Sequence, residues 1–379
     1  MSRSQGIMTG NGGTSELLQA GITQRALSAF VAQYPDHILT KDARQYIHDS
    51  AKSVVPFTLN ASHDALSYPL DRLSNGNALL AYSTYAPDNQ TLELDGTFLD
   101  AADALRQSID LNRRTPVGGL WYFTYPDWCY LDGMWSLAPF WTSYSIYAES
   151  ELGASQNTTL DALYLMYYQL DLLWLSTYHS PTGLLVHGYD ASRNASWAAP
   201  GTGASPHVWG RSLGWYTMAL VDTIETLDSY PHTRPALRRL IVEKYVDLAS
   251  ALITAADNKT GGWWQVMDEP GREKNYIESS GSAMFSYALV KGARLGYFAD
   301  EKTADEAMSA GLRAWGYLTD TFVVTEANNT LGYNGTVSVC SLNSTASYDY
   351  YVGQPINYNS VLGSGAYILA SLEAERMGM

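Results

Sequence analysis

Apolar residues recur every three or four positions along most of this chain, which is the spacing of one face of an α-helix. In 237–255 they fall at Leu237, Ile241, Tyr245, Leu248, Leu252 and Ala255. The segment 213–227 follows the same rule. The segment 160–178 is apolar on more than one side, so we expect it to form a helix buried between neighbouring helices.

Further segments carry the same helical period, at 16–34, 77–85, 97–111, 134–150, 281–298, 305–321 and 363–377. Loops rich in Gly, Asn, Asp and Ser separate them, and we expect short strands in these loops, for example at 260–268. No linker or exact repeat divides the chain, so one domain is expected over 1–379. Roughly a dozen helices with long loops predict an all-α fold, an (α/α)6 barrel of paired helices closed into a ring, with an α-solenoid as the alternative.

Charge and composition narrow the classes of function. Of the 379 residues 46% are apolar, the formal net charge is −15 and the pI is about 4.8. Nucleic-acid binders need a basic face, and anionic membranes attract basic segments, so we expect neither partner. No stretch is long and apolar enough for a transmembrane helix.

Cysteines and glycosylation sequons bear on the compartment. Cys129 and Cys340 could form one disulfide or remain two buried thiols. Eight Asn-x-Ser/Thr sequons occur, at Asn60, Asn89, Asn157, Asn194, Asn258, Asn328, Asn334 and Asn343. So many sequons favour a secreted, extracellular glycoprotein, although the first ten residues lack the apolar core of a signal peptide.

Asp132 stands inside an aromatic run, YPDWCYLDGMWSLAPFWTS, at 125–143. A buried carboxylate is costly unless it is paired, hydrogen-bonded or protonated. The simpler interpretation is an N-cap of the following helix. The other is a general acid, because an aromatic shell favours the neutral form of a carboxylic acid. That shell would consist of Trp128, Tyr130, Trp135 and Trp141.

A second acid, Asp71, also precedes a predicted helix, in YPLDRLSNGNALLAY. Taken alone it is more simply a helix cap. Two carboxylates in front of two helices of one barrel could nevertheless meet at the same end. A pair of acids is the usual machinery of glycoside cleavage.

The segment 187–215 combines an arginine with aromatic residues, at His187, Trp209, Arg211 and Trp215. Arginine matches a carboxylate with a planar fork, and indoles stack on sugars. These residues indicate a site for an acidic sugar. The structural alternatives are an arginine stacked on tryptophan and a hydrogen-bonded loop histidine. No zinc-protease, phosphate-loop, dinucleotide or nucleophile-elbow motif is present, and no metal cluster is evident.

Several blocks together resemble the unsaturated uronyl hydrolases of glycoside hydrolase family 105, which are related to family 88. The blocks are YPDWCYLDGMWSLAPF, the stretch from HGYD to SPHVWGRSLGWYTMALVD, ESSGSAMFSYALVKGARLGY and GSGAYILASLEAER. The resemblance spans 65–375, whereas residues 1–60 match the family poorly. Trp121 and Ser136 stand where family members often carry His and Met.

The resemblance implies an (α/α)6 barrel that removes a 4,5-unsaturated uronic acid from lyase-generated oligosaccharides of the rhamnogalacturonan (pectin) or glucuronyl type. Asp132 would protonate C4 and water would add at C5, after which the hemiketal collapses. Asp71 would be the second acid, and His187, Trp209, Arg211 and Trp215 would contact substrate. No metal or cofactor is implied, and we expect a monomer. The alternatives are an inverting glycosidase, a polysaccharide lyase and a non-catalytic sugar-binding barrel.

Overall fold

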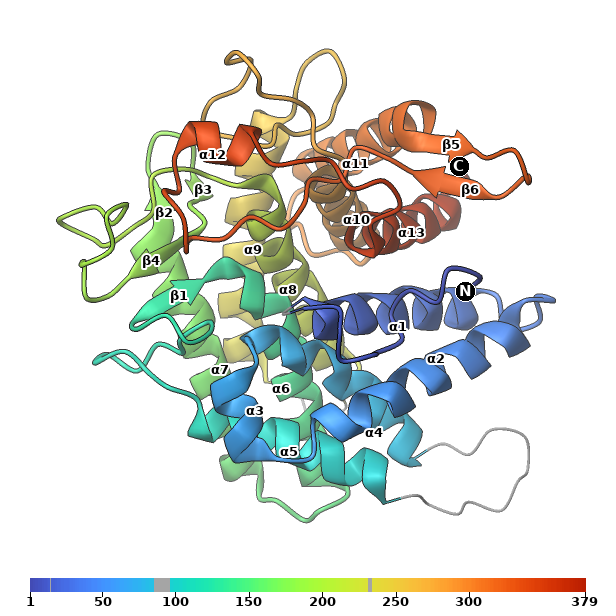
Figure 1. The fold of residues 1–379 in the computed structure, drawn as a ribbon, viewed down its shortest axis with the longest axis vertical. Coiled ribbons are helices and arrows are strands. Elements are labelled where there is room, and N and C mark those ends of the chain that lie inside the picture. Colours follow the sequence, from blue (N-terminus) through green and yellow to red (C-terminus); the bar gives the residue numbers. More distant parts are fainter. Residues whose placement is uncertain (14, 85–95, 231–233) are drawn as a thin grey trace.

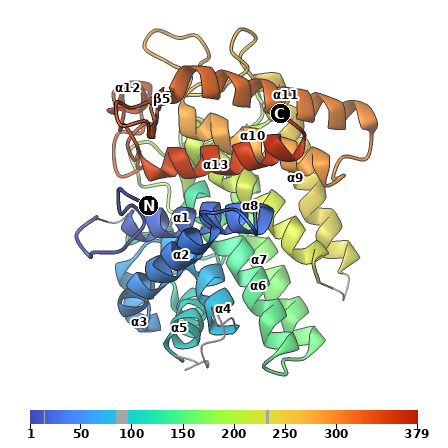
Figure 2. The ribbon, with the colours of Figure 1, turned by 90° about the vertical axis from the view of Figure 1, so that its right-hand side faces the viewer.

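The computed structural model describes residues 1–13, 15–84, 96–230 and 234–379. Its helices form two concentric layers (Figures 1 and 2). The inner layer consists of α1 (Glu16–Gln33), η2 (Leu70–Asn75) with α4 (Gly76–Thr84), α6 (Met134–Ser150), α8 (Gly210–Asp228), α10 (Ser279–Arg294) and α13 (Val361–Arg376). Each of these packs on the next, and α13 returns to α1, so the ring is closed. In Figure 1 the first helix, in blue, lies beside the last, in dark red.

The outer layer pairs one helix with each of the first five inner segments. It consists of α2 (Thr40–Val54) on α1, α5 (Thr97–Leu111) on α4, α7 (Gln156–Thr177) on α6, α9 (Pro235–Ala255) on α8 and α11 (Glu301–Phe322) on α10. Short helices lie between them, at η1 (Val55–Phe57), α3 (Ala61–Ser67), η3 (Leu131–Gly133) and α12 (Tyr348–Val352). The predicted (α/α)6 barrel is confirmed.

The two layers differ in how far their helices are buried. The inner helix α8 is buried on nearly every side, whereas α9 buries one stripe, which contains Leu237, Ile241, Tyr245, Leu248 and Leu252. The expectation for 160–178 is wrong. This segment belongs to the outer helix α7, where Leu165 and Leu175 are 56% and 70% exposed, because one stripe is enough to pack it on the inner ring.

The inner helices approach closely at the end where the candidate site lies. A Cβ added to Gly281 would lie 3.0 Å from the carbonyl carbon of Gly210. Only glycine therefore lets the first turns of α8 and α10 meet at this distance. This contact fixes the start of α8, which carries several of the predicted site residues.

Three two-stranded antiparallel sheets decorate the described part of the chain. They pair β1 (Trp128–Tyr130) with β4 (Gly188–Asp190), β2 (Tyr178–His179) with β3 (Leu184–Leu185), and β5 (Val323–Thr325) with β6 (Leu331–Tyr333). The strand expected at 260–268 is reduced to isolated bridges, Trp209 with Val266 and Trp264 with Ile277.

Cys129 and Cys340 are both buried free thiols and form no disulfide. Of the described helices, none has the length and hydropathy to span a membrane. The predicted helix end at Tyr85 and the sequon at Asn89 lie outside the described residues.

Candidate active site

The pairing of β1 with β4 brings His187 to Asp132. Tyr130 is opposite Gly188 in this ladder, and the Leu131 N–H donates to the His187 carbonyl at 3.1 Å. The chain then enters η3, which carries Asp132. As a result His187 Nε2 lies 3.1 Å from Asp132 Oδ2, although the two atoms are not aligned for a hydrogen bond.

Asp132 does not cap α6, because the N-cap position is Gly133 and no side chain caps this helix. Its Oδ2 instead accepts a hydrogen bond of 2.6 Å from Ser212 Oγ, on the first turn of α8. The Asp132 side chain is 11% exposed. The carboxylate is thus held from α8 while one edge stays within reach of solvent.

Asp71 is the more deeply buried carboxyl group, at 3% exposure. Its Oδ2 accepts a hydrogen bond of 2.8 Å from Tyr122 Oη, and its Oδ1 has no partner among the described residues. Burial raises the pKa of Asp71 to about 7; the Tyr122 hydrogen bond and Arg72 oppose this, while the nearby charge of Asp132 adds to it. Asp71 therefore keeps its proton up to nearly neutral pH.

Arg72 anchors the turn that carries Asp71. It is fully buried, and its guanidinium donates to the Tyr68 carbonyl at 3.1 Å, to Ser108 Oγ at 2.9 Å and to Asn112 Oδ1 at 3.0 Å. These contacts tie η2 to α5 and leave Arg72 without a hydrogen bond to the neighbouring carboxylate. Asp71 is consequently oriented by a rigid turn rather than neutralised by an ion pair.

Aromatic rings connect the two acids. Tyr122 stacks on Tyr130 with centroids 4.4 Å apart and an interplanar angle of 9°. Tyr130 meets the His187 ring edge-on at 5.2 Å, and His187 lies 4.8 Å from the Trp209 ring. On its other side His187 Nδ1 hydrogen-bonds Tyr351 Oη, on α12, at 2.7 Å. The histidine is therefore fixed in place between two tyrosines and an indole.

The remaining predicted residues are Trp209, the N-cap of α8, and Arg211 and Trp215 within α8. They contact different neighbours. Arg211 Nη1 and Nη2 donate to the carbonyls of Val337 and Ser338 at 2.5 and 2.8 Å, and its guanidinium lies over Trp209 at 4.9 Å. Trp215 packs on Trp135 at 5.0 Å. Both Arg211 and Trp215 are 1% exposed. In this state Arg211 fastens the 337–338 loop to the barrel.

Glu278 secures the same loop from α10. Its Oε1 accepts from the Val337 N–H at 3.0 Å, and its Oε2 accepts from the Gly281 N–H at 2.7 Å. The backbone of the loop is thus held by an arginine through its carbonyls and by a glutamate through an N–H. Arg211 and Glu278, which are far apart in the sequence, thus hold the 337–338 loop beside the start of α8.

Sequence reasoning missed three residues of this site. Ser212 lies within the WGRSLGWY block, so its neighbours could have drawn attention to it. Tyr122 and Tyr351 carry no local signal, because they meet Asp71 and His187 only through the fold.

One described group could offer three metal ligands, His207, Asp268 and Glu269, with candidate ligand atoms within 4.8 Å of one another. His207 Nδ1 already hydrogen-bonds Asp268 Oδ2 at 2.9 Å, and Asp268 Oδ1 accepts from the Val208 N–H at 2.7 Å. His207 and Asp268 are thus already bonded to each other and to the backbone, and Glu269 pairs with Arg272 at 3.0 Å.

Comparison with known proteins agrees with this architecture. The sequence matches the model of glycosyl hydrolase family 88 over residues 19–378. A solved family 105 glycoside hydrolase from C. acetobutylicum ATCC 824 has a TM-score of 0.78 and 29% identity, covering 94% of this chain and 92% of that chain. The 24.9 kDa protein in picA locus of Rhizobium radiobacter is 38% identical over 201 residues, which are 51% of this chain and 82% of that protein.

The fold is also that of a Bacillus sp. GL1 unsaturated glucuronyl hydrolase responsible for the degradation of glycosaminoglycan. Its TM-score is 0.59 at 15% identity, over 97% of this chain and 88% of that chain. The family match begins at residue 19 and so includes α1, whereas the motif resemblance begins at residue 65.

Proposed function

The chain belongs to glycosyl hydrolase family 88 and to the related family 105, and from this membership we propose that it removes a 4,5-unsaturated uronic acid from the non-reducing end of oligosaccharides. The observation that carries the proposal is the pair of acids in η2 and η3. Burial raises the pKa of one of them, Asp71, to about 7, and the nearby charge of Asp132 adds to this. A carboxyl group that holds its proton up to nearly neutral pH beside a second acid suits a site that protonates a carbon atom.

Asp132 is the better placed of the two to meet a substrate, because it is less buried than Asp71. In the proposed reaction the Asp132 carboxyl gives its proton to C4 of the unsaturated ring, and positive charge develops at C5 and the ring oxygen. Water adds at C5 and returns a proton to Asp132. The resulting hemiketal opens and releases the rest of the oligosaccharide as an alcohol.

Asp71 supports this cycle from the interior. Its protonated form leaves the site with no more negative charge than that of Asp132, so an anionic substrate meets one carboxylate at most. Ser212 fixes the orientation of Asp132 Oδ2, and His187 Nε2 lies 3.1 Å from the same oxygen. Oriented acids of this kind contribute about a hundredfold or more to proton transfer.

The decisive assay follows the ultraviolet absorbance of the conjugated C4=C5 bond. Unsaturated rhamnogalacturonan and glucuronan oligosaccharides are the substrates, and wild type is compared with Asp132→Asn. Asp64→Asn is the matched control, since Asp64 is also buried, but in α3. Absorbance should fall with wild type and the control and stay constant with Asp132→Asn. A rise would indicate a lyase, and a constant signal with release of sugar would indicate an ordinary glycosidase.

We further propose that the protein is a secreted glycoprotein. The sequon asparagines in the described residues are all exposed, at Asn60, Asn157, Asn194, Asn258, Asn328, Asn334 and Asn343. An endoglycosidase that removes N-linked glycans should raise the gel mobility of protein taken from its native source. Unchanged mobility and an unmodified mass would refute this part of the proposal.

A further inference from the structure

The inner ring contains a cavity to which neither of the two acids contributes. Its volume is about 300 Å³, and α1, α4, α6 and α8 line it. On α6 the lining residues follow Asp132, and on α8 they lie in the last third of the helix. The polar and aromatic lining includes Gln24, Arg25, Asn77, Trp135, Ser136 and Glu225. Asp71 and Asp132 do not contribute to this lining.

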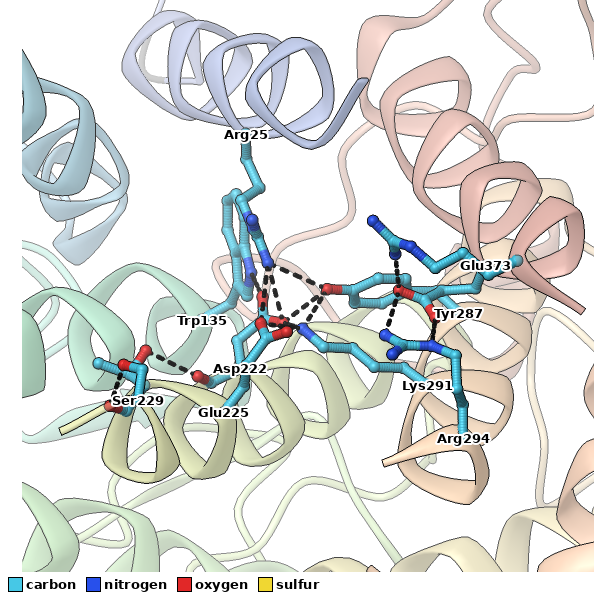
Figure 3. Close-up of polar contacts among 11 residues, drawn as sticks. Arg25, Trp135, Asp222, Glu225, Ser229, Tyr287, Lys291, Arg294 and Glu373 are labelled. Carbon is cyan, nitrogen blue, oxygen red and sulfur yellow. Dashed lines mark hydrogen bonds and ion pairs between the residues drawn. The ribbon is translucent and has the colours of Figure 1, made fainter. Parts of the chain in front are cut away.

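A network of charged residues forms one side of the cavity (Figure 3). Asp222 Oδ1 accepts from Lys291 Nζ at 2.5 Å and from Tyr287 Oη at 2.6 Å, and its Oδ2 accepts from Trp135 Nε1 at 3.1 Å. Lys291 also lies 2.7 Å from Glu225 Oε2. With Arg25 the network contains two cations and two anions, so this side of the cavity carries no net charge.

Arg25 is the loosely held member of this network. Its Nη2 lies 3.5 Å from Asp222 Oδ1, 3.5 Å from Glu225 Oε2 and 3.3 Å from Tyr287 Oη. Its side chain is 34% exposed, whereas that of Lys291 is 1% exposed. Lys291 is committed to the network, while Arg25 can reorient toward a ligand without leaving a buried charge unpaired.

Two buried oxygens of the lining side chains lack hydrogen-bond partners among the described residues. They are Gln24 Oε1 and Ser136 Oγ, in side chains that are 2% and 1% exposed. The Gln24 amide nitrogen is used by Ser50 Oγ at 3.0 Å, so only its oxygen is left. Buried polar groups are nearly always hydrogen-bonded, so a water or a ligand hydroxyl in the cavity would complete the hydrogen bonding of these two atoms.

We propose that this cavity binds a neutral sugar or polyol of about one hexose in size. Hydroxyl groups both donate and accept, and they match a lining in which an arginine donor alternates with glutamate, glutamine and serine acceptors. An anion would meet Glu225 and a cation would meet Arg25, so a neutral ligand is preferred. A volume of about 300 Å³ lies at the low end for ligand pockets, and Trp135 supplies an aromatic neighbour. The site is separate from the acids and does not depend on the function proposed for them.

Isothermal titration calorimetry with glucose, rhamnose and inositol tests this site, with glucuronate as the charged comparison. Arg25→Gln removes the loose donor, and Ser136→Met fills the cavity. Arg239→Gln is the matched control, because Arg239 pairs with Glu243 on the outer helix α9 and is 73% exposed. Circular dichroism and the melting temperature establish that each variant is folded.

Saturable binding of at least one neutral probe is expected in wild type and in Arg239→Gln. Arg25→Gln should weaken it about tenfold, the loss of one charge-assisted hydrogen bond, and Ser136→Met should abolish it. Asp132→Asn should bind as wild type does. The proposal is overturned if no neutral probe binds, or if binding survives in both cavity variants and is lost in Asp132→Asn. The absorbance assay is independent of these outcomes.

Discussion

Replacing Asp71 with asparagine should make the protein more stable at alkaline pH while impairing its activity. The native structure raises the pKa of Asp71 from 3.8 to about 7, chiefly by burial. Below about pH 4 the group is protonated in both the native and the unfolded chain. Between these two pKa values the unfolded chain ionises and the native state does not, so stability falls as pH rises.

The size of this loss follows from the two pKa values. A pKa difference of one between the native and unfolded states corresponds to about 1.4 kcal/mol of unfolding free energy. The change in the pKa of Asp71 from 3.8 to about 7 therefore corresponds to about 4 kcal/mol at pH 8. Asparagine imitates the neutral acid and can still accept the Tyr122 hydrogen bond. The free energy of unfolding of Asp71→Asn should therefore equal that of wild type near pH 4 and exceed it by about 4 kcal/mol at pH 8.

Urea unfolding of both proteins between pH 4 and pH 8 measures this difference directly. Asp190→Asn provides a control of opposite sign. Burial works against the ionised form of Asp190, but hydrogen bonds from Ser192 and from the Ala195 N–H outweigh it and hold its pKa below the usual range. The Asp190→Asn variant should be less stable than wild type at pH 8, and this difference should shrink as the pH is lowered. A gap between Asp71→Asn and wild type that does not change with pH would refute the reasoning.

Three further predictions concern residues that orient the site. Tyr351→Phe removes the hydrogen bond to His187 Nδ1. It should lower kcat/KM about tenfold while the melting temperature stays unchanged. A lower melting temperature alongside the lower kcat/KM would mean that Tyr351 has a purely structural role. Ser212→Ala removes the donor to Asp132 Oδ2, so the carboxyl group is no longer held in one orientation and kcat/KM should fall about tenfold; an unchanged kcat/KM would contradict this. Arg211→Lys cannot reproduce both carbonyl contacts and should cost about 1–3 kcal/mol of unfolding free energy in urea, and a cost near zero would show that the loop is held by other contacts.

The spacing of apolar residues predicted the helices well, because a helix that packs on one face carries apolar residues every three or four positions. The predicted segments 97–111 and 134–150 coincide with α5 and α6. The outer helix α2 was not predicted, although Ala43, Ile47, Ala51 and Val54 have the required spacing and are buried. For α7 the pattern was misleading, because apolar residues on the exposed side of a helix look the same in sequence as buried ones.

The site was predictable only in part, for a different physical reason. Asp132 and Asp71 stand out locally, as carboxylates among aromatic and apolar residues. Tyr351 reaches His187 across 164 positions of the sequence, and nothing near Tyr351 records that contact. The two uses of Arg211, as a ligand for a sugar carboxylate or as a clamp on the 337–338 loop, require the same residue type. Their distinction depends on neighbours that only the fold supplies.

The barrel contains two buried carboxylates whose surroundings make them chemically opposite. Asp222 is held by Lys291 together with Arg25, Tyr287 and Trp135, and these partners overcome burial and hold its pKa well below the usual range. Asp71 has one hydroxyl partner and a second carboxylate nearby, so it is neutralised by a proton.

This contrast separates a carboxylate that is fixed in its ionised form from one that can carry a proton beside the proposed acid, Asp132. A group whose pKa lies well below the usual range stays ionised at ordinary pH and does not exchange a proton during a reaction. A group with a pKa of about 7 can do so at ordinary pH. Removing Lys291 should therefore destabilise the barrel by leaving a buried charge with weaker compensation, whereas removing Tyr122 should retune the acid pair. We therefore assign the proposed proton transfer to Asp71 and Asp132, whereas the network around Asp222 holds α6, α8 and α10 together.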